Sequence, residues 1–336
     1  MRALVMPAPG VAEVQEWPTP EPGLGEVRVK VAAAGICAGD LYIYKGVNPY
    51  ATYPCIAGHE LAGEIEKLGE GVVGWEVGER VVVEPFLGCG NCYPCRIGKS
   101  NCCAKLQIIG IHKPGGYAEF CIAPQTHLHR VPDGMSLSLA SFAEPLAIGV
   151  QSCRRGEVVA GEHVLILGAG PIGLAIVEVV KALGAHPVIT DLNAERLAFA
   201  KTLGAETLPG GEELLESALA FTHGEGFPVV MEATGAVAAM EQSVELVASG
   251  GRVVIVGLVK PGTGVTFPGL DFTRKELTLV GSRASVGCFP EALALLASGT
   301  IRYPQVATML SLWDAPETFA TLARNPAAFH KVILQT

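Results

Sequence analysis

The sequence feature that most constrains the fold is an aliphatic run that leads directly into a glycine-rich segment. Val164–Leu167 is entirely aliphatic, and Gly168–Gly173 (GAGPIG) follows it without a break. An apolar run without polar alternation is typical of a strand that is buried on both faces. Pro171–Leu183 then predicts a helix. A buried strand, a tight turn and a helix in this order predict the beginning of an α/β sheet.

The alternation of strands and helices continues through the second half of the chain. The further expected strands are Pro187–Thr190, Val229–Glu232, Arg252–Val256 and Leu277–Val280, and the expected helices are Ala194–Leu203 and Val237–Val247. Apolar strands that alternate with helices predict a doubly wound parallel sheet with helices on both faces. We therefore expect an α/β fold in this part of the chain.

The first 135 residues have a different pattern. Short β-branched runs recur at Glu26–Val31, Arg80–Val83 and Gly116–Ile122, with Gly, Pro and Asn between them. This pattern predicts a β-rich module of half-buried antiparallel strands. Ser141–Gly156 predicts a connecting helix, and the end of the chain holds two helix candidates and a last strand, Lys331–Leu334.

Length and charge limit the class of protein. A chain of 336 residues is consistent with about two domains. The net charge is −9 and no basic run is present, so we expect no nucleic-acid partner. The longest uncharged apolar stretch near the middle, Val164–Val177, is shorter than the ~18 residues that a membrane span needs. Met1–Gly10 lacks the pattern of a signal peptide.

The glycines of the Gly168–Gly173 segment have distinct expected roles. Gly168 makes the turn, Gly170 lets backbone amides approach a pyrophosphate, and Gly173 lets the helix pack closely on the strand. Pro171 and Ile172 complete this cofactor-binding loop, and the helix N-terminus supplies partial positive charge for phosphates. The alternative is a glycine-rich turn that binds nothing. The flanking strand and helix favour a dinucleotide site.

Asp191 and Arg196 extend this interpretation to the choice of cofactor. Asp191 ends the next expected strand, where a carboxylate hydrogen-bonds the ribose hydroxyls of NAD and repels the extra phosphate of NADP. Arg196 follows one helical turn later and is a candidate to stack on the adenine. NAD is therefore the expected cofactor.

A cluster of cysteines predicts a structural metal site. Cys89, Cys92, Cys95 and Cys103 place four thiolates in one segment, which suits a closed tetrahedral zinc site. An iron–sulfur cluster is the competing interpretation, because C-x2-C-x2-C also occurs there. Cys102 is adjacent, and spacing alone does not exclude that it replaces Cys103.

The chain contains ten cysteines in total, and these could form five disulfides in a secreted protein. The size of the chain, its N-terminus and the metal-ligand spacing instead favour a reduced, cytoplasmic protein.

A second ligand set is dispersed along the chain. Cys37, His59, Glu60 and Glu144 together offer one thiolate, one imidazole and two carboxylates. Such a set suits a catalytic zinc ion that keeps a position for water or substrate. Asp40 is a candidate to orient His59. An isolated histidine of this kind is more often an ordinary half-buried side chain.

Taken in order, these motifs resemble the zinc-containing medium-chain alcohol dehydrogenase family over essentially the whole chain. The motifs are Gly58-His59-Glu60, the four-cysteine segment, Gly116–Glu119, Glu144-Pro145 and Gly168–Gly173. The resemblance implies a chaperonin-10-like β catalytic domain, formed by residues 1–147 and a C-terminal return at 287–336, and a Rossmann domain at 148–286. It implies an active-site cleft at their junction and a homodimer or homotetramer.

The resemblance also implies site residues. Cys37, His59 and one or both of Glu60 and Glu144 would bind the catalytic zinc, the second of two zinc ions in each chain. A glutamate at position 144 resembles the sorbitol and threonine dehydrogenase branch. Within it, segments such as Ile43–Gly46, Ser100–Cys103 and Gly281–Arg283 are similar to L-galactonate and L-gulonate 5-dehydrogenases and their starvation-sensing relatives.

Two positions depart from the family pattern. Gly39 stands where the family carries a hydroxyl residue that relays the substrate proton, and Tyr42 stands where threonine and sorbitol dehydrogenases carry a histidine. Tyr42 either restores a hydroxyl or packs on the cleft wall, and water is a further candidate for the relay.

The expected function is oxidation of a secondary alcohol of a polyol or sugar acid by an NAD-dependent zinc enzyme. Arg283, after an expected strand, is a candidate anchor for a substrate carboxylate, with a loop or subunit contact as the structural alternative. The competing functions are another zinc polyol, inositol-type or L-threonine dehydrogenase, and a non-enzymatic sensor of NAD or a sugar acid. A zinc-free quinone reductase would lack the cysteine segment and Glu60.

Overall fold

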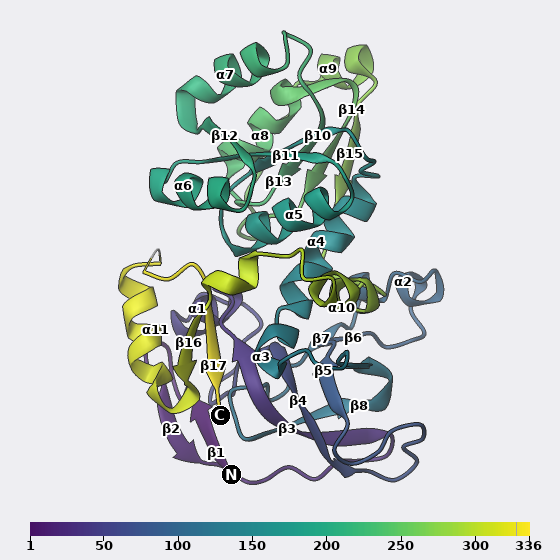
Figure 1. Cartoon of the computed structure of the whole chain (residues 1–336), viewed down its shortest axis with the longest axis vertical. Coiled ribbons are helices and arrows are strands. Elements are labelled where there is room, and N and C mark those ends of the chain that lie inside the picture. The colour runs from purple at the N-terminus through teal and green to yellow at the C-terminus, as the bar shows by residue number, and fades with distance from the viewer. Residues whose placement is uncertain (327) are drawn as a thin grey trace. The chain divides into compact units, whose positions relative to one another are not determined.

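The computed structural model describes residues 1–326 and 328–336, which form two compact units (Figure 1). The first unit contains Met1–Glu144, Phe289–Gly299 and Pro304–Thr336. The second contains Pro145–Cys288 and Thr300–Tyr303. The first unit is therefore built from both ends of the sequence.

The first unit is organised around a seven-stranded sheet. Its strand order is β16-β17-β3-β4-β5-β9, with β8 also paired to β3. Two small sheets, β1–β2 and β6–β7, complete the unit. The strands are β1 (Arg2–Val5), β2 (Glu13–Glu16), β3 (Glu26–Gly35), β4 (Glu60–Leu68), β5 (Arg80–Val83), β6 (Phe86–Leu87), β7 (Gln107–Ile108), β8 (Phe120–Pro124), β9 (Leu128–Arg130), β16 (Thr308–Ser311) and β17 (Val332–Gln335). The helices are α1 (Ala38–Tyr44), α2 (Tyr93–Arg96), α3 (Leu137–Ala140), α10 (Phe289–Ala297) and α11 (Ala315–Arg324).

Pairing in this sheet gathers segments that are distant in sequence. β3 pairs antiparallel with β4, so Gly35 at the end of β3 lies opposite Glu60 at the start of β4. β17 pairs antiparallel with the same part of β3, through Ile333 and Gly35. The end of β3, the start of β4 and the C-terminal strand therefore meet at one place in the sheet.

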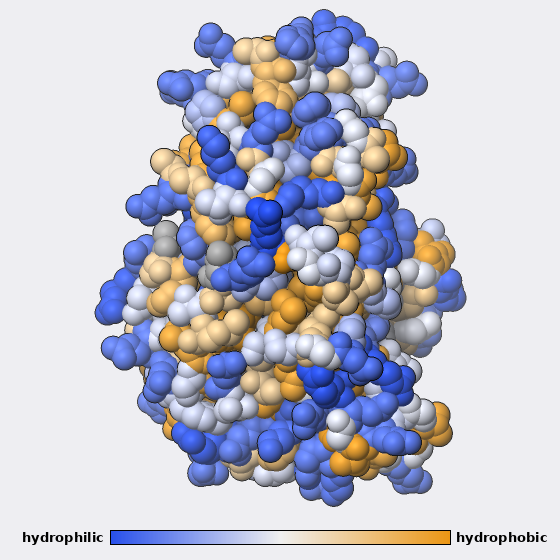
Figure 2. All heavy atoms as spheres, viewed as in Figure 1, coloured by the Kyte–Doolittle hydropathy of each residue, from blue (hydrophilic) through white to orange (hydrophobic). Residues whose placement is uncertain are grey.

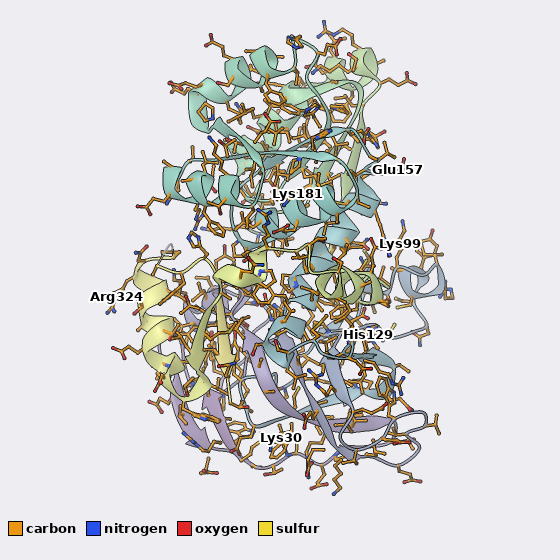
Figure 3. All side chains as sticks on the ribbon, in the orientation of Figure 1. Lys30, Lys99, His129, Glu157, Lys181 and Arg324 are labelled. Atoms are coloured by element: carbon orange, nitrogen blue, oxygen red, sulfur yellow. The ribbon has the colours of Figure 1, made fainter. Side chains whose placement is uncertain are left out.

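Helix α10 is attached to the first unit by an aromatic contact. His129 lies on β9 and is labelled in Figure 3. Its ring stacks on that of Phe289 at a centroid distance of 5.0 Å. His129 Nε2 also lies 2.9 Å from the carboxylate of Glu84. Both Phe289 and Leu293 of α10 are buried.

The second unit is a six-stranded sheet in which every neighbouring pair of strands is parallel. Its strand order is β12-β11-β10-β13-β14-β15. The strands are β10 (His163–Leu167), β11 (His186–Asp191), β12 (Glu206–Pro209), β13 (Phe227–Glu232), β14 (Val247–Ile255) and β15 (Thr278–Gly281). The helices are α5 (Pro171–Ala182), α6 (Ala194–Thr202), α7 (Leu214–Phe221), α8 (Val237–Leu246) and α9 (Gly269–Lys275), while α4 (Ala143–Arg155) leads into the unit. The predicted α/β fold with a parallel Rossmann sheet is confirmed.

One predicted strand begins later than expected. β8 starts at Phe120, not at Gly116. Gly116 N–H and Tyr117 N–H donate to the carbonyl oxygens of Gly58 and Ala57 instead, at 2.8 and 3.1 Å. These bonds hold residues 116 and 117 against the turn that precedes β4, and they remove both residues from the regular ladder.

Hydrophilic residues cover much of the face shown in Figure 2, with apolar residues interspersed among them. Among the residues that the structure describes, no helix is long and apolar enough to cross a membrane.

Candidate active site and cofactor loop

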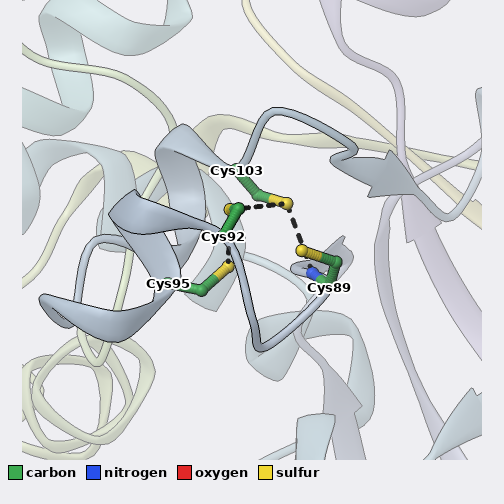
Figure 4. Close-up of side chains that lie close together, drawn as sticks. All are labelled: Cys89, Cys92, Cys95 and Cys103. Atoms are coloured by element: carbon green, nitrogen blue, oxygen red, sulfur yellow. Dashed lines mark hydrogen bonds between the residues drawn. The ribbon is translucent and has the colours of Figure 1, made fainter.

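Four cysteine sulfurs converge in the segment between β6 and β7 (Figure 4). The cluster consists of Cys89, Cys92, Cys95 and Cys103, whose Sγ atoms all lie within 4.8 Å of one another. Cys102 is exposed and lies outside this cluster.

The geometry of this cluster fits a tetrahedral zinc ion. Four sulfurs at ~2.3 Å from one zinc ion lie ~3.8 Å apart. Cys92 Sγ lies 3.4 Å from Cys95 Sγ and 3.7 Å from Cys103 Sγ. Backbone N–H groups of Cys89 and Lys105 donate to Cys103 Sγ at 3.3 Å. The cluster therefore offers four protein ligands and additional donors that stabilise thiolate charge.

A second ligand set lies where β3, β4 and α1 meet. Ligand atoms of Cys37, His59 and Glu60 all lie within 4.8 Å of one another. Cys37 is the N-cap residue of α1, and Glu60 is the first residue of β4. A Cβ atom on Gly35 would lie 1.9 Å from Glu60 Oε2, so a side chain at position 35 would displace this carboxylate. Thiolate, imidazole and carboxylate are the donor types of catalytic zinc sites.

Asp40 connects these ligands. Its Oδ2 accepts hydrogen bonds from Cys37 N–H and the Tyr117 hydroxyl, both at 2.8 Å, and its Oδ1 lies 3.5 Å from His59 Nδ1. Burial alone would raise the pKa of Asp40, but His59 and these donors hold the pKa below its ordinary value. Burial likewise opposes protonation of His59, yet the Asp40 carboxylate holds the imidazole pKa well above its ordinary value.

Glu144 is a buried carboxylate within electrostatic range of this set. Neither of its oxygens has a hydrogen-bond partner among the described residues. Burial raises the pKa of its carboxyl group to about 7. His59 lowers this pKa, and the like charge of Glu60 raises it. A buried carboxylate without donors is poorly stabilised, and coordination of a cation would supply the missing interaction.

Lys331 is a charged residue of this region that sequence analysis missed. It is buried immediately before β17, where its ammonium group donates to Glu60 Oε2 and, at 3.0 Å, to the carbonyl oxygen of Ile36. The ion pair holds one oxygen of Glu60. No local pattern joins residues 271 positions apart. The pairing of β3 with both β17 and β4 brings them together.

Gly39 and Tyr42 occupy the positions at which related enzymes carry relay residues, and only the first of these positions faces the ligand set. A Cβ atom on Gly39 would lie 3.8 Å from His59 Cε1 and 3.9 Å from Cys37 Sγ, so this position faces the ligand set and has room. Tyr42, on the same short helix, is 55% exposed. Within the described part of the chain, its hydroxyl makes no hydrogen bond to the ligand set.

In the second unit, the glycine loop joins β10 to α5. Gly168 has a φ of +105°, which favours glycine at this turn. A Cβ atom on Gly173 would lie 1.9 Å from Gly168 O, so the helix and strand pack too closely for a side chain. Nothing lies within 4 Å of a Cβ atom built on Gly170, the N-cap of α5. This open helix N-terminus, continued by Pro171 and Ile172, fits a pyrophosphate.

Asp191 ends β11 beside this loop. Its Oδ2 accepts a hydrogen bond from Ala169 N–H at 2.8 Å, and its Oδ1 accepts one from Asn193 N–H at 2.8 Å. The guanidinium of Arg196 lies 3.8 Å from Asp191 Oδ2. The carboxylate is thereby fixed next to the first glycines of the loop.

Arg283 lies two residues beyond the end of β15 and is exposed. It belongs to the second unit, whereas the cysteine, histidine and glutamate ligands belong to the first. Its role toward substrate stays a prediction.

Comparisons with known proteins agree with this picture. Residues 23–133 match the model of the alcohol dehydrogenase GroES-like domain, and residues 171–298 match that of the zinc-binding dehydrogenases. The chain is 36% identical to an uncharacterized zinc-type alcohol dehydrogenase-like protein of Haemophilus influenzae, over 99% of this chain and 98% of that protein. It is also 36% identical to the L-galactonate-5-dehydrogenase of Escherichia coli K12, over 97% of this chain and 94% of that protein.

A solved structure shares the complete fold. The alcohol dehydrogenase rspB of Escherichia coli CFT073, in complex with NADH, superposes with a TM-score of 0.93 at 32% identity. The match covers 100% of this chain and 99% of that chain.

Proposed function

Because the chain belongs to the zinc-type medium-chain alcohol dehydrogenase family, we propose that it oxidises a secondary alcohol of a sugar acid or polyol to a ketone with NAD⁺. The family makes it a zinc-dependent enzyme that acts on a CH–OH group with NAD or NADP. The finer proposal is a 5-dehydrogenase of the L-gulonate or L-galactonate type. The observation that carries it is the near full-length similarity to the L-galactonate-5-dehydrogenase.

The proposed catalytic zinc is held by Cys37, His59 and one or both of the carboxylates of Glu60 and Glu144. When bound, zinc would act as a Lewis acid that lowers the pKa of the substrate hydroxyl. The protein residues orient this site. Asp40 supports His59, and Lys331 holds one oxygen of Glu60. A second zinc ion is proposed for Cys89, Cys92, Cys95 and Cys103, where all four positions are protein ligands.

The proposed cofactor is NAD. When bound, NAD⁺ would accept the hydride from the substrate carbon. Gly168, Gly170 and Gly173 shape the loop that admits its pyrophosphate, and Asp191 is the proposed acceptor for its ribose hydroxyls. The negative charge of Asp191 disfavours the ribose phosphate of NADP, and Arg196 is proposed to stack on the adenine.

Two residues, Arg283 and Gly39, are proposed to contribute to substrate binding. Arg283 is the proposed anchor of a substrate carboxylate, because a guanidinium matches a carboxylate in two parallel hydrogen bonds. Gly39 leaves room for a water molecule or a substrate hydroxyl beside Cys37 and His59.

The test is reduction of NAD⁺ to NADH, or of NADP⁺ to NADPH, with a panel of L-gulonate, L-galactonate, sorbitol, L-threonine and myo-inositol. The proposal expects the highest kcat/KM with one of the two aldonates and NAD⁺. Faster oxidation of threonine or of a neutral polyol would replace the proposed substrate class. We further propose a homodimer or homotetramer, which light scattering of the purified protein would test.

A further inference from the structure

The hydroxyl of Tyr117 is buried against both segments that carry the first two proposed metal ligands. Tyr117 has no exposed surface. Its hydroxyl lies 2.8 Å from Asp40 Oδ2 and 2.9 Å from the carbonyl oxygen of Gly35. Asp40 faces His59, and Gly35 lies two residues before Cys37. One hydroxyl therefore reaches the backbone that leads to Cys37 and the carboxylate that faces His59.

The rest of Tyr117 holds the segment before His59. Its backbone N–H donates to Ala57 O at 3.1 Å. Its ring occupies the space beside Gly58, where a Cβ atom would lie 2.6 Å from the ring. The ring and the backbone of Tyr117 thus hold the turn at Ala57 and Gly58, and its hydroxyl group makes the hydrogen bond to Asp40.

The donors around Asp40 are few. Oδ2 accepts from Cys37 N–H and Tyr117 O–H, and Oδ1 from Gly58 N–H at 3.3 Å. Without the tyrosine hydroxyl, Oδ2 would keep the Cys37 N–H as its donor among the described residues, and the buried carboxylate would be held less firmly. Carboxylates that contact the far nitrogen of a metal-bound histidine set its tautomer and ring orientation.

We propose that Tyr117 is a positioning residue for the catalytic metal: its hydroxyl fixes Asp40 and, through Asp40, orients His59. The inference rests on the proposed assignment of Cys37 and His59 as ligands. It goes beyond that assignment because it states that Tyr117, which is not a ligand, affects the affinity of the site for its metal ion.

The test is metal release from the cobalt(II)-substituted protein. Tyr117→Phe keeps the ring and its edge contact with Phe319, at a centroid distance of 5.8 Å, and removes only the hydroxyl. Loss of a group that orients a ligand typically weakens metal affinity by ~10–100-fold. We expect cobalt release to a chelator to accelerate by about this factor and the d–d absorption of the mixed-ligand site to shift. Release from the four-cysteine site should be unchanged.

Two comparisons separate positioning from a general loss of stability. Asp40→Asn should release cobalt faster by itself, and Tyr117→Phe should add little in that background. Tyr53→Phe removes another tyrosine hydroxyl of the same unit, one that donates to Ile43 O, and should leave release and spectrum unchanged.

A conservative variant covers the case in which Tyr117→Phe does not fold. 3-Fluorotyrosine at position 117 retains the hydroxyl and should release cobalt within a few-fold of the wild-type rate. Unchanged release and spectrum in folded Tyr117→Phe, or equal effects in Tyr53→Phe, would overturn the proposal. A wild-type protein that binds cobalt only at the four cysteines would instead overturn the assignment of the catalytic site itself.

Discussion

Asp191 carries the prediction about the cofactor. Its carboxylate is fixed by Ala169 and Asn193 beside the glycine loop, so a ribose phosphate there would meet a like charge at short range. We expect NAD⁺ to exceed NADP⁺ in kcat/KM by on the order of a hundredfold or more. Asp191→Ser should narrow this ratio, whereas Asp133→Ser, at an exposed turn, should not change it. Equal use of both cofactors by the wild-type enzyme would show that the role of Asp191 is wrong.

Arg283 carries the prediction about substrate charge. If its guanidinium binds the substrate carboxylate, Arg283→Ala should raise KM for aldonates by roughly one to two orders of magnitude. KM for neutral polyols should change little, because they have no carboxylate. Arg274→Ala, which removes an exposed arginine paired with Asp271, provides the control. An equal rise in KM for charged and neutral substrates would show that Arg283 has a structural role instead.

Glu144 carries a prediction about the stability of the metal-free protein. Its carboxyl has a pKa of about 7 in the folded state, against an ordinary value of 4.5. Between these values the folded state binds the proton more tightly than the unfolded state, so this group destabilises the fold as pH rises through the window. The loss approaches ~3 kcal/mol above pH 7.

Glu144→Gln removes this charge, so its metal-free form should lose less stability than the wild type between pH 5 and pH 7.5. Denaturant unfolding of both proteins at several pH values, each freed of metal, measures the difference. Parallel stability curves for the two proteins would show that Glu144 does not titrate in this range.

Sequence patterns located the chemistry of single residues but not the contacts among them. The spacing of the cysteines and the position of Asp191 were readable because local motifs fix them. The partners Lys331 and Tyr117 were not, because each reaches the ligand set only through sheet pairing or a loop contact. Burial of a lysine beside a glutamate leaves no signal in a linear sequence.

At the scale of elements, the strands buried on both faces were the most predictable. β10 and β13 contain the buried apolar runs Val164–Leu167 and Val229–Met231 and lie in the middle of the parallel sheet. β12, at the edge, was not predicted, because Glu206–Pro209 is only partly buried and carries no apolar run. Helix α7 was not predicted either.

In the loop between β10 and α5, Gly173 is needed for packing, whereas Gly170 is proposed to leave space for the ligand. Gly173→Ala would place a Cβ atom 1.9 Å from Gly168 O, so we expect a loss of ~1–3 kcal/mol in stability. Gly170→Ala meets no atom within 4 Å and has an ordinary negative φ, so the unliganded protein should keep its melting temperature. Its methyl group would instead occupy space proposed for the pyrophosphate.

Thermal unfolding and NADH fluorescence titration check both variants. Gly170→Ala should weaken NADH binding without changing Tm, and Gly173→Ala should lower Tm. Unchanged NADH affinity in Gly170→Ala would place the pyrophosphate elsewhere.

At the scale of the whole molecule, the two proposed metal sites differ in how easily they give up their ion. The four cysteines leave no exchangeable position, whereas the second set has mixed ligands. We expect two zinc ions per chain, of which mild chelation removes one and abolishes activity before the protein unfolds. Metal analysis that finds fewer than two zinc ions in fresh, active protein would contradict this.

The net charge of −9 gives the last prediction. A protein with an excess of negative charge repels an anionic substrate at long range, and salt screens this repulsion within a Debye length of about 10 Å at 0.1 M. For an aldonate, kcat/KM should therefore rise as ionic strength increases from low values, until screening of the proposed contact with Arg283 offsets the gain. A neutral polyol measured in the same buffers should show no such rise, because it carries no charge to be repelled. Steady-state kinetics over a salt series at constant pH make the comparison. A fall in kcat/KM for the aldonate from the lowest salt onward would mean that local positive charge near the site, and not the charge of the whole chain, governs the approach of the substrate.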